Sequence, residues 1–397
     1  MKLARMKLAR MKLALLNGNR FNPWHFQGYK YIEGNPEITA FRAESEIQEL
    51  FDERDDGSAG FRFERIYFDT QAGSPISRLV KAAQTRYLGR EPRILPFYER
   101  LQGFDLLHSW ELFTDWSEQA LVAREKYRVP LLVMVWDNIP FNMERNPARR
   151  DLKKRVAAGA DLFVVHTERS RRMLGMEGVG ANRIVLINPG VDTDRFCPGP
   201  RDRSGFGLGE EDFVILFVGW FLPRKGMDYL LLALRELLQD AQCGKRRVRL
   251  LAVGSGPGKD RIDRLVDRLD LRDSCVFPGS LPYSRMPDAF RAADVFVLPS
   301  IATPEWQEQF GMSLIEAMSC SIPVVTTLSG AISEIAGDSA LLCQPNDFVS
   351  ILDALKRLMA NPGLREDLGA RGRQRALDLF TLEQFAAGLG SAYSRLA

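Results

Sequence analysis

Two glutamates, Glu308 and Glu316, lie eight positions apart in the run EQFGMSLIE. Apolar residues such as Phe310 and Leu314 recur at helical spacing, which predicts a helix that begins near Gly311. Glu308 would then lie in the loop ahead of the helix. Glu316 would lie inside it, roughly 8 Å farther along the axis at about 1.5 Å per residue. The two carboxylates would therefore flank the start of a helix.

The start of this helix is expected to bind an anion. The N–H groups of Gly311, Met312 and Ser313 would be in the first turn, where they lack helical partners and where the helix dipole favours negative charge. Carboxylates accept hydrogen bonds from hydroxyl groups. Together these features predict a ligand with a diphosphate centre and a hydroxyl-rich group on either side, as in a nucleotide-sugar. Two glutamates alone at this spacing are more often part of a solvated surface.

Strand-like and helix-like segments alternate along the chain, a pattern typical of parallel sheets. A stretch rich in Gly, Pro and Asp at 188–212 separates two such series and is interpreted as a linker. Strands are predicted at 12–17, 61–69, 104–109, 130–136, 160–166, 183–188, 213–219, 249–254, 274–279, 294–300, 322–327 and 340–343, and helices include 44–53, 117–127 and 147–158.

The length of 397 residues also favours two domains. We therefore predict an α/β protein with two Rossmann-like, doubly wound domains that face each other across a cleft. Residues 11–190 would form the N-terminal domain and residues 191–380 the C-terminal domain. A final helical segment, 381–397, would pack back on the first domain. The basic repeat at 1–10 is expected to be a disordered extension.

Composition restricts the class of protein further. An apolar content of 45% and a charged content of 26% are ordinary for a globular domain, and the net charge of +3 is too small to indicate nucleic-acid binding. The five cysteines form no CxxC pair, which favours reduced thiols and a cytoplasmic location. The three histidines lack ligand spacing, so no metal site is expected.

Several motifs in order resemble the GT-B glycosyltransferases of the large retaining class called family 4. FVGWFLPRKG resembles that family's "VGR…KG" strand and phosphate loop, and LLAVGSGP its "L.IVG.GP". NPGVDTDRF resembles the "NGVD…F" crossover between domains, and Glu308 with Glu316 matches the family's E-x7-E pair. The resemblance extends from about Lys12 to the C-terminus. It implies that residues 11–190 form the acceptor-binding domain and residues 191–380 the nucleotide-sugar-binding domain.

The resemblance implies roles for four side chains. Arg224 and Lys225 would bind the donor diphosphate and stabilise the charge that builds as it leaves. Glu308 would hydrogen-bond hydroxyls of the transferred sugar. Glu316 would hold the ribose, since a carboxylate accepts two hydrogen bonds from a vicinal diol.

Backbone groups would complete the donor site in the family's pattern. Gly219 would belong to the phosphate loop, and the amides of residues 311–313 would contact the distal phosphate. Gly279, Ser280 and Leu281 would meet the nucleobase, mainly through their backbone groups. The base itself is not predicted by these residues.

The chain departs from the family at two places. Trp220 stands where a phosphate-binding arginine usually follows the glycine of "VGR", so the cationic clamp would rest on Arg224 and Lys225. Trp136 stands where the first domain usually has an active-site histidine. Asp137 or His108 is expected to supply a catalytic contact there, although a lone histidine at a strand end is more often structural.

The implied reaction is transfer of a hexosyl-type unit from a nucleoside diphosphate sugar to a hydroxyl of a glycan or lipid-linked acceptor, with the anomeric configuration retained. No cofactor and no metal would be required, because the leaving phosphate takes the acceptor proton. The run Asp192-Thr193-Asp194 matches a DxD pattern but falls in the linker, where a structural turn is expected.

Other functions are weighed against this one. A GT-B epimerase or a non-catalytic nucleotide-sugar-binding protein would share the same donor site. An NAD-dependent oxidoreductase has only Gly254-Ser-Gly256-Pro-Gly258 in its favour, which is GxGxG rather than GxGxxG, and the next strand ends without an acid for ribose. The Walker pattern GxxxxGK[ST] is absent from the sequence.

A basic segment at 145–155, NPARRDLKKRV with the preceding arginine, suggests a further contact. Its cations most simply form a solvated helix face. The alternative is peripheral binding to anionic lipid at the inner face of the plasma membrane, next to a lipid-linked acceptor. The cations are Arg145, Arg149, Arg150, Lys153, Lys154 and Arg155.

Overall fold

The computed structural model describes residues 8–16, 23–43, 60–71, 80–81, 92–240 and 247–397. The chain forms two compact units. Unit 1 comprises Met1–Asn188 and Glu383–Ala397, and unit 2 comprises Pro189–Leu382. The two junctions between the units, after residues 188 and 382, each lie two residues from those expected after residues 190 and 380.

Unit 1 contains a sheet of seven parallel strands in the order β3-β2-β1-β4-β5-β6-β7. The order in which successive strands are added to the sheet reverses between β1 and β4, as in a doubly wound fold. The five residues of β5 are all buried, because helices cover both faces of the sheet. The strands are β1 (Lys12–Leu16), β2 (Glu37–Ala43), β3 (Arg62–Ile66), β4 (Leu106–Trp110), β5 (Leu131–Val135), β6 (Leu162–Val165) and β7 (Ile184–Leu186).

Unit 2 repeats this topology with six parallel strands in the order β10-β9-β8-β11-β12-β13. Here the reversal of strand order falls between β8 and β11. The strands are β8 (Phe213–Val218), β9 (Val248–Val253), β10 (Cys275–Gly279), β11 (Val295–Leu298), β12 (Val324–Thr327) and β13 (Ala340–Cys343). All six occupy segments in which the sequence predicts strands.

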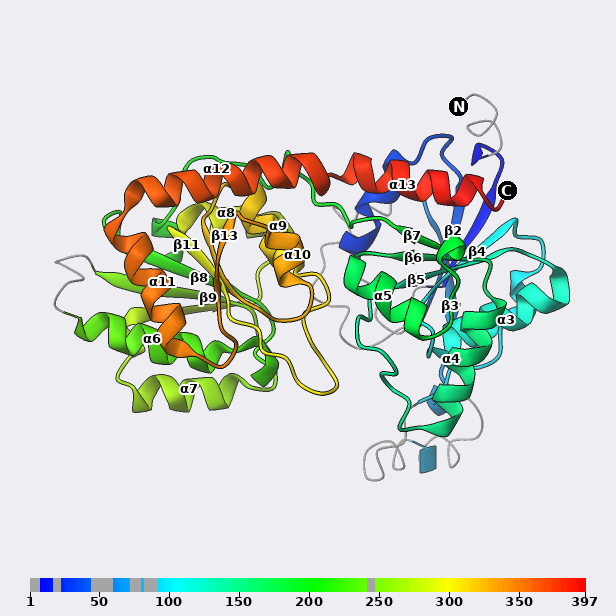
Figure 1. The fold of residues 1–397 in the computed structure, drawn as a ribbon, viewed down its shortest axis with the longest axis horizontal. Helices are drawn as coiled ribbons and strands as arrows, with labels where there is room; N and C mark the ends of the chain where they lie inside the picture. Colours follow the sequence, from blue (N-terminus) through cyan, green and yellow to red (C-terminus); the bar gives the residue numbers. More distant parts are fainter. Residues whose placement is uncertain (1–7, 17–22, 44–59, 72–79, 82–91, 241–246) are drawn as a thin grey trace. The chain divides into compact units, whose positions relative to one another are not determined.

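Helices cover both faces of each sheet (Figure 1). In unit 1, α3 (Asp115–Tyr127), α4 (Pro147–Gly159) and α5 (Glu168–Met176) pack on one face, and α13 (Leu382–Ser394) packs on the other. In unit 2, one face carries α6 (Met227–Gln239), α7 (Lys259–Arg268) and α11 (Phe348–Ala360). The other carries α8 (Met286–Ala292), α9 (Met312–Ser319) and α12 (Pro362–Leu379), with the short α10 (Ile332–Ala336) nearby.

Local capping explains where several helices begin. The Thr114 hydroxyl accepts a hydrogen bond from the Ser117 N–H at the start of α3. At α4, the Asn146 side chain accepts from the Ala148 N–H, and Pro147 occupies the first helical position, where its missing N–H is not needed. The helices predicted at 117–127 and 147–158 therefore have their observed starts set by short-range chemistry.

Unit 1 differs from the sequence-based expectation at its N-terminal end. Strand β2 was not predicted. Residues 8–10 were expected to be disordered, but the Leu8 side chain is only 3% exposed and packs in the core beneath α13, while residues 1–7 lie outside the described part. The helix predicted at 44–53 also lies outside the described residues. None of the described helices is long and apolar enough to cross a membrane.

Candidate functional site

Two loops of unit 2 meet beside the point where its strand order reverses, between β8 and β11. The first follows β8 and runs from Gly219 through the 3-10 helix η8 (Pro223–Lys225) to Gly226. The second follows β11. The Ile301 N–H donates to the Arg224 carbonyl across 2.9 Å and joins the two loops. Ligands of doubly wound sheets bind at this kind of crevice, outside the carboxyl ends of the strands.

Gly226 is required for this junction. It has φ +70, and a Cβ atom built on it would lie 1.8 Å from the carbonyl oxygen of Pro299. A side chain at this position would force the two loops apart, so the close approach depends on glycine.

An ion pair links the two loops through side chains. Lys225 Nζ lies 2.8 Å from Glu308 Oε2, and the Ser300 hydroxyl donates to the same oxygen across 2.7 Å. The side chains of Lys225 and Glu308 are only 18% and 9% exposed. The pair therefore places an ammonium group and a carboxylate together at the edge of the sheet.

The backbone of Glu308 is also fixed. Its carbonyl oxygen accepts from the Ala331 N–H across 2.9 Å. Gly330 crosses so closely that a Cβ on it would lie 2.0 Å from that oxygen. The backbone of Glu308 is thus packed closely against the Gly330–Ala331 segment.

Helix α9 starts directly after this loop, as predicted. Its N-cap is Gly311, which has φ +90 and no side chain to cap the helix. The amides of Met312 and Ser313 therefore open the helix without a capping side chain, in the position where a helix dipole attracts an anion.

Glu316 lies inside α9, and its side chain is largely buried. The Tyr283 hydroxyl, from the 3-10 helix η11 (Tyr283–Arg285), donates to Glu316 Oε1 across 3.1 Å. Burial raises the pKa of Glu316 to about 7, while the hydrogen bond from Tyr283 lowers it. This carboxyl group is poised between its two protonation states near neutral pH.

The segment predicted to meet a base follows β10. Gly279 has φ +81, and its carbonyl oxygen accepts from the Gly254 N–H across 2.9 Å. The hydroxyls of Ser280 and Ser255 are 2.9 Å apart, and Leu281 is half-buried beside them. Loops after β9 and β10 are thereby held together.

The glycine run at 254–258 has a structural cause. A Cβ on Gly254 would lie 2.0 Å from the Gly219 carbonyl oxygen, and one on Gly258 would lie 2.4 Å from that of Phe221. The Phe221 N–H donates to the Ser255 carbonyl across 2.8 Å. These glycines let two loops pack, which accounts for their spacing without a dinucleotide.

Two protein-family models match the chain, one within unit 2 and one mostly within unit 1. The model of the family "Glycosyl transferases group 1" matches residues 200–375, and that of "Glycosyltransferase Family 4" matches residues 56–195. The D-inositol 3-phosphate glycosyltransferase of Nocardia farcinica is 30% identical over 330 residues, which cover 77% of this chain and 69% of the relative. That of Gordonia bronchialis is 29% identical over 74% of this chain and 66% of its own length.

The chain belongs to the group 1 glycosyltransferases. Solved structures share its fold: sucrose-phosphate synthase from Thermosynechococcus elongatus has a TM-score of 0.75 at 22% identity, covering 98% of this chain and 99% of its own. Anabaena HepE in complex with UDP has a TM-score of 0.74 at 17% identity, covering 97% and 100%. The fold is thus GT-B, with two Rossmann-like domains, as the sequence predicts. The matched part spans about two thirds of these curated relatives.

In this glycosyltransferase, unit 2 brings most of the predicted donor residues together. Arg224, Lys225 and Glu308 are joined by the contacts described above, and Gly311 and Glu316 follow on the same loop and helix. Trp220 is 47% exposed at the place of the family's arginine. Ligand contacts of all these residues stay predictions.

His108 belongs to the core of unit 1. It is 0% exposed on β4, its Nδ1 lies 2.7 Å from the Tyr393 hydroxyl, and its ring stacks on Trp110 with centroids 4.3 Å apart. Burial lowers the pKa of His108 to about 3, so the imidazole is neutral at physiological pH. These contacts give His108 a packing role in unit 1.

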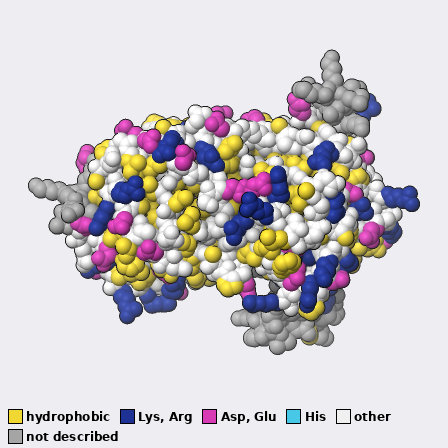
Figure 2. Space-filling model, viewed as in Figure 1, with side chains coloured by type: hydrophobic (Ala, Val, Ile, Leu, Met, Phe, Trp, Pro, Cys, Tyr) yellow, Lys and Arg dark blue, Asp and Glu magenta, His cyan; other side chains and the backbone are white. Residues whose placement is uncertain are grey.

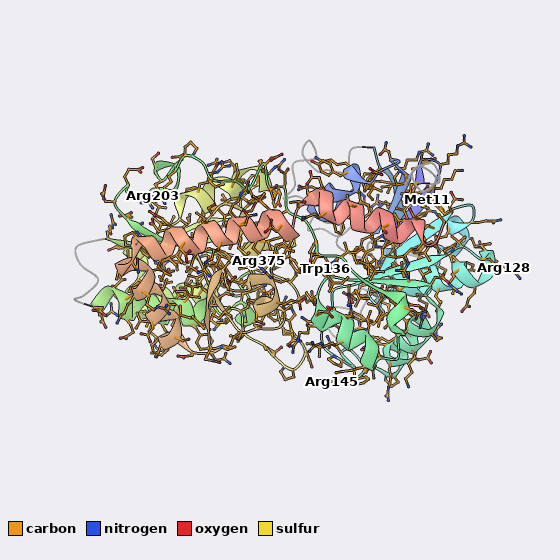
Figure 3. The ribbon with its side chains drawn as sticks, turned by 45° about the horizontal axis from the view of Figure 1, so that its top comes forward. Met11, Arg128, Trp136, Arg145, Arg203 and Arg375 are labelled. Atoms are coloured by element: carbon orange, nitrogen blue, oxygen red, sulfur yellow. The ribbon has the colours of Figure 1, made fainter. Side chains whose placement is uncertain are left out.

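Asp137 lies in the loop after β5 and directly follows Trp136 in the sequence. Trp136 is labelled in Figure 3. Its carboxylate accepts from the Ile139 N–H and from the Asn142 side chain, and burial raises its pKa. Glu111, which the sequence did not single out, caps the N–H groups of Trp136 and Asp137 through Oε1. Burial and the neighbouring Asp137 raise the pKa of Glu111 to about 8.

The basic segment does not form one continuous cationic face. Lys153 is 2% exposed, and its Nζ lies 2.6 Å from Glu177 Oε1. Arg155 pairs with Glu118 and Asp151. Arg150 and Lys154 stay exposed on α4. On the face drawn in Figure 2, basic and acidic side chains are interspersed.

The run Asp192-Thr193-Asp194 is a turn in unit 2. Asp192 Oδ1 accepts from the N–H groups of Asp194 and Arg195, at 3.2 and 3.0 Å. The hydrogen bonds are local, as expected for the structural interpretation of this DxD match.

Proposed function

We propose that this glycosyltransferase moves a hexosyl-type unit from a nucleoside diphosphate sugar to a hydroxyl of a glycan or lipid-linked acceptor, with retained configuration and without a metal. The Lys225–Glu308 pair beside the uncapped start of α9 supports this proposal most directly. In the proposed complex, the Lys225 ammonium group and the amides of α9 would face the leaving diphosphate, and the Glu308 carboxylate would face the sugar.

The residues present suit such a departure. As the glycosyl–phosphate bond breaks, negative charge grows on the distal phosphate, and Lys225 with the amides of residues 312–313 would stabilise it. Glu308, held by Ser300, would orient the sugar through its hydroxyls. The phosphate oxygen would take the acceptor proton, so a protein base is not required.

The relatives suggest which substrates to try first. HepE structures contain UDP and UDP-glucose, and the curated relatives are named for D-inositol 3-phosphate. We therefore propose a UDP-sugar as the first donor and include a phosphorylated cyclitol among the acceptors. We also propose a cytoplasmic location, because the four described cysteines are free thiols. A position peripheral to the inner membrane face depends on the basic segment 145–155 and is tested separately.

The test begins with a donor panel. UDP-, GDP- and ADP-sugars are added separately, and the donor that raises the melting temperature is carried forward. Release of the nucleoside diphosphate is then measured with and without acceptor. Release only with acceptor supports transfer, whereas interconversion of the sugar alone identifies an epimerase, and binding alone identifies a non-catalytic protein.

Variants at the site complete the test. Lys225→Ala and Glu308→Gln should each reduce turnover by about 100-fold or more, as for the loss of a group that stabilises a transition state. Lys356→Ala is the matched control, because Lys356 pairs with Asp240 elsewhere in unit 2. Unchanged turnover in both site variants, with normal folding, would refute the assignment.

Membrane contact through residues 145–155 is a separate part of the proposal. Because Lys153 is buried and Arg155 is paired, exposed cations such as Arg150 and Lys154 would carry it. Flotation with anionic but not neutral vesicles is expected, and it should weaken in Arg150→Ala/Lys154→Ala. Equal flotation with both vesicle types would contradict it.

A further inference from the structure

Trp306 lies between β11 and α9 in a short hairpin turn. The Thr303 N–H donates to the Trp306 carbonyl across 2.6 Å, and the Trp306 N–H donates to the Thr303 carbonyl across 3.3 Å. The two hydrogen bonds hold the turn that carries the indole ring. The side chain is half-buried.

The ring contacts both cations of the neighbouring loop. The guanidinium carbon of Arg224 lies 4.6 Å from the ring centroid, and Lys225 Nζ lies 5.0 Å from it. Both distances are within the range of cation–π attraction. One aromatic side chain from the β11 loop therefore contacts two consecutive cations of the β8 loop.

The contact of the Trp306 ring with both cations offsets part of the repulsion between them. The positive side chains of Arg224 and Lys225 are adjacent in the chain and repel each other. An indole face attracts both cations through its quadrupole. The ring accepts no conventional hydrogen bond, so its contact with the two cations uses none of their N–H donors.

We propose that Trp306 is a positioning residue that holds Arg224 and Lys225 ready for the pyrophosphate group of the donor. The inference rests on the proposed function and deepens it. Because Trp220 carries no charge, the proposed clamp depends on Arg224 and Lys225, and their preorganisation would set its affinity for the diphosphate.

The position of Trp306 separates two kinds of binding. Its contacts are with the cations, so it should act on the diphosphate and not on the nucleoside. Turnover should also fall, because the same cations would stabilise the leaving diphosphate. A merely structural role in the loop would weaken nucleoside and diphosphate binding together.

The experiment compares three probes on the full-length protein: the nucleoside diphosphate identified by the donor panel, its nucleoside, and inorganic pyrophosphate. Trp306→Leu keeps an apolar side chain without a π face, and Trp306→Phe keeps a smaller π face. Dissociation constants are measured by calorimetry at low and high salt. Thermal unfolding confirms that each variant is folded.

Trp306→Leu should weaken diphosphate and pyrophosphate binding by about 5- to 30-fold, while Trp306→Phe should retain most of the affinity. Nucleoside binding should be unchanged in both. Equal losses for nucleoside and diphosphate, or identical behaviour of the two variants, would overturn the inference. A wild-type protein that binds no diphosphate would instead refute the proposed function, and the role of Trp306 with it.

Discussion

Single residues of the site owe their chemistry to burial. Glu316 is removed from water on α9, so its carboxyl group keeps a proton to a higher pH than an exposed glutamate, with its pKa raised to about 7. In the unfolded chain the same group ionises near pH 4.5. The stabilising contribution of Glu316 to the free energy of unfolding is therefore fully present below pH 4.5 and is lost as the pH rises through about 7.

Ligand binding should reverse this preference. A ribose diol donates hydrogen bonds, so it binds the ionised carboxylate, and nucleoside affinity should increase as pH rises through 7. Below that pH, the dissociation constant should rise roughly tenfold per pH unit. A nucleoside is the better probe, because a terminal phosphate titrates near pH 6 by itself.

Glu316→Gln is the control for this pH dependence. It keeps the size of the side chain and an oxygen to accept from Tyr283, but it does not titrate. Calorimetry from about pH 5 to about pH 9 should show a flat profile in the variant. A flat profile in the wild-type protein would exclude ionisation of Glu316 from nucleoside binding.

At the scale of elements, the site depends on how closely the loops after β8 and β11 approach. Gly226 illustrates this, because it caps η8 with φ +70 directly against the Pro299 carbonyl. Gly207 caps another 3-10 helix of unit 2, η7 (Ser204–Phe206), with φ +68, and a Cβ on it would meet nothing within 4 Å. The two glycines share a conformation and differ in their surroundings.

Alanine at these two positions separates backbone strain from steric conflict. Gly207→Ala should cost about 1–2 kcal/mol, the usual penalty for the left-handed region. Gly226→Ala should cost several kcal/mol more and should abolish diphosphate binding, because the two loops would separate. Urea unfolding and calorimetry measure both effects. Equal destabilisation by the two substitutions would show that the steric conflict with Pro299 does not add to the loss in the free energy of unfolding.

At the scale of the whole molecule, each unit has its own core, and the end of the chain belongs to the first. Helix α13 buries Phe385, Leu389 and Tyr393 against the sheet of unit 1. Units with separate cores can unfold separately. A donor nucleotide should therefore stabilise unit 2 and raise the temperature of its unfolding transition.

Tyr393→Ala tests this division. It removes a fully buried side chain and should cost unit 1 about 3–5 kcal/mol. Scanning calorimetry should show a lower transition for unit 1, with the nucleotide-dependent transition retained. Leu355→Ala, in the core of unit 2, should instead lower the nucleotide-dependent transition of unit 2 and leave that of unit 1 unchanged. If both variants lowered one common transition, the two units would not unfold independently.

Short-range patterns in the sequence were sufficient for much of this architecture. Runs of apolar residues predict all six strands of unit 2, and the spacing after Gly311 predicts the start of α9 and places Glu308 before it. These features depend on neighbours within a few positions, where periodicity and backbone conformation act directly. Strand β2 was missed.

Tertiary structure alone decided which distant side chains meet. His108 lies beside Tyr393, 285 positions later, and Lys153 lies beside Glu177 in the interior of unit 1. Tyr283 meets Glu316, and Trp306 covers Arg224, because loops from different strands converge at one edge of a parallel sheet. No local pattern encodes such contacts, since they depend on the packing of elements that are far apart in the chain.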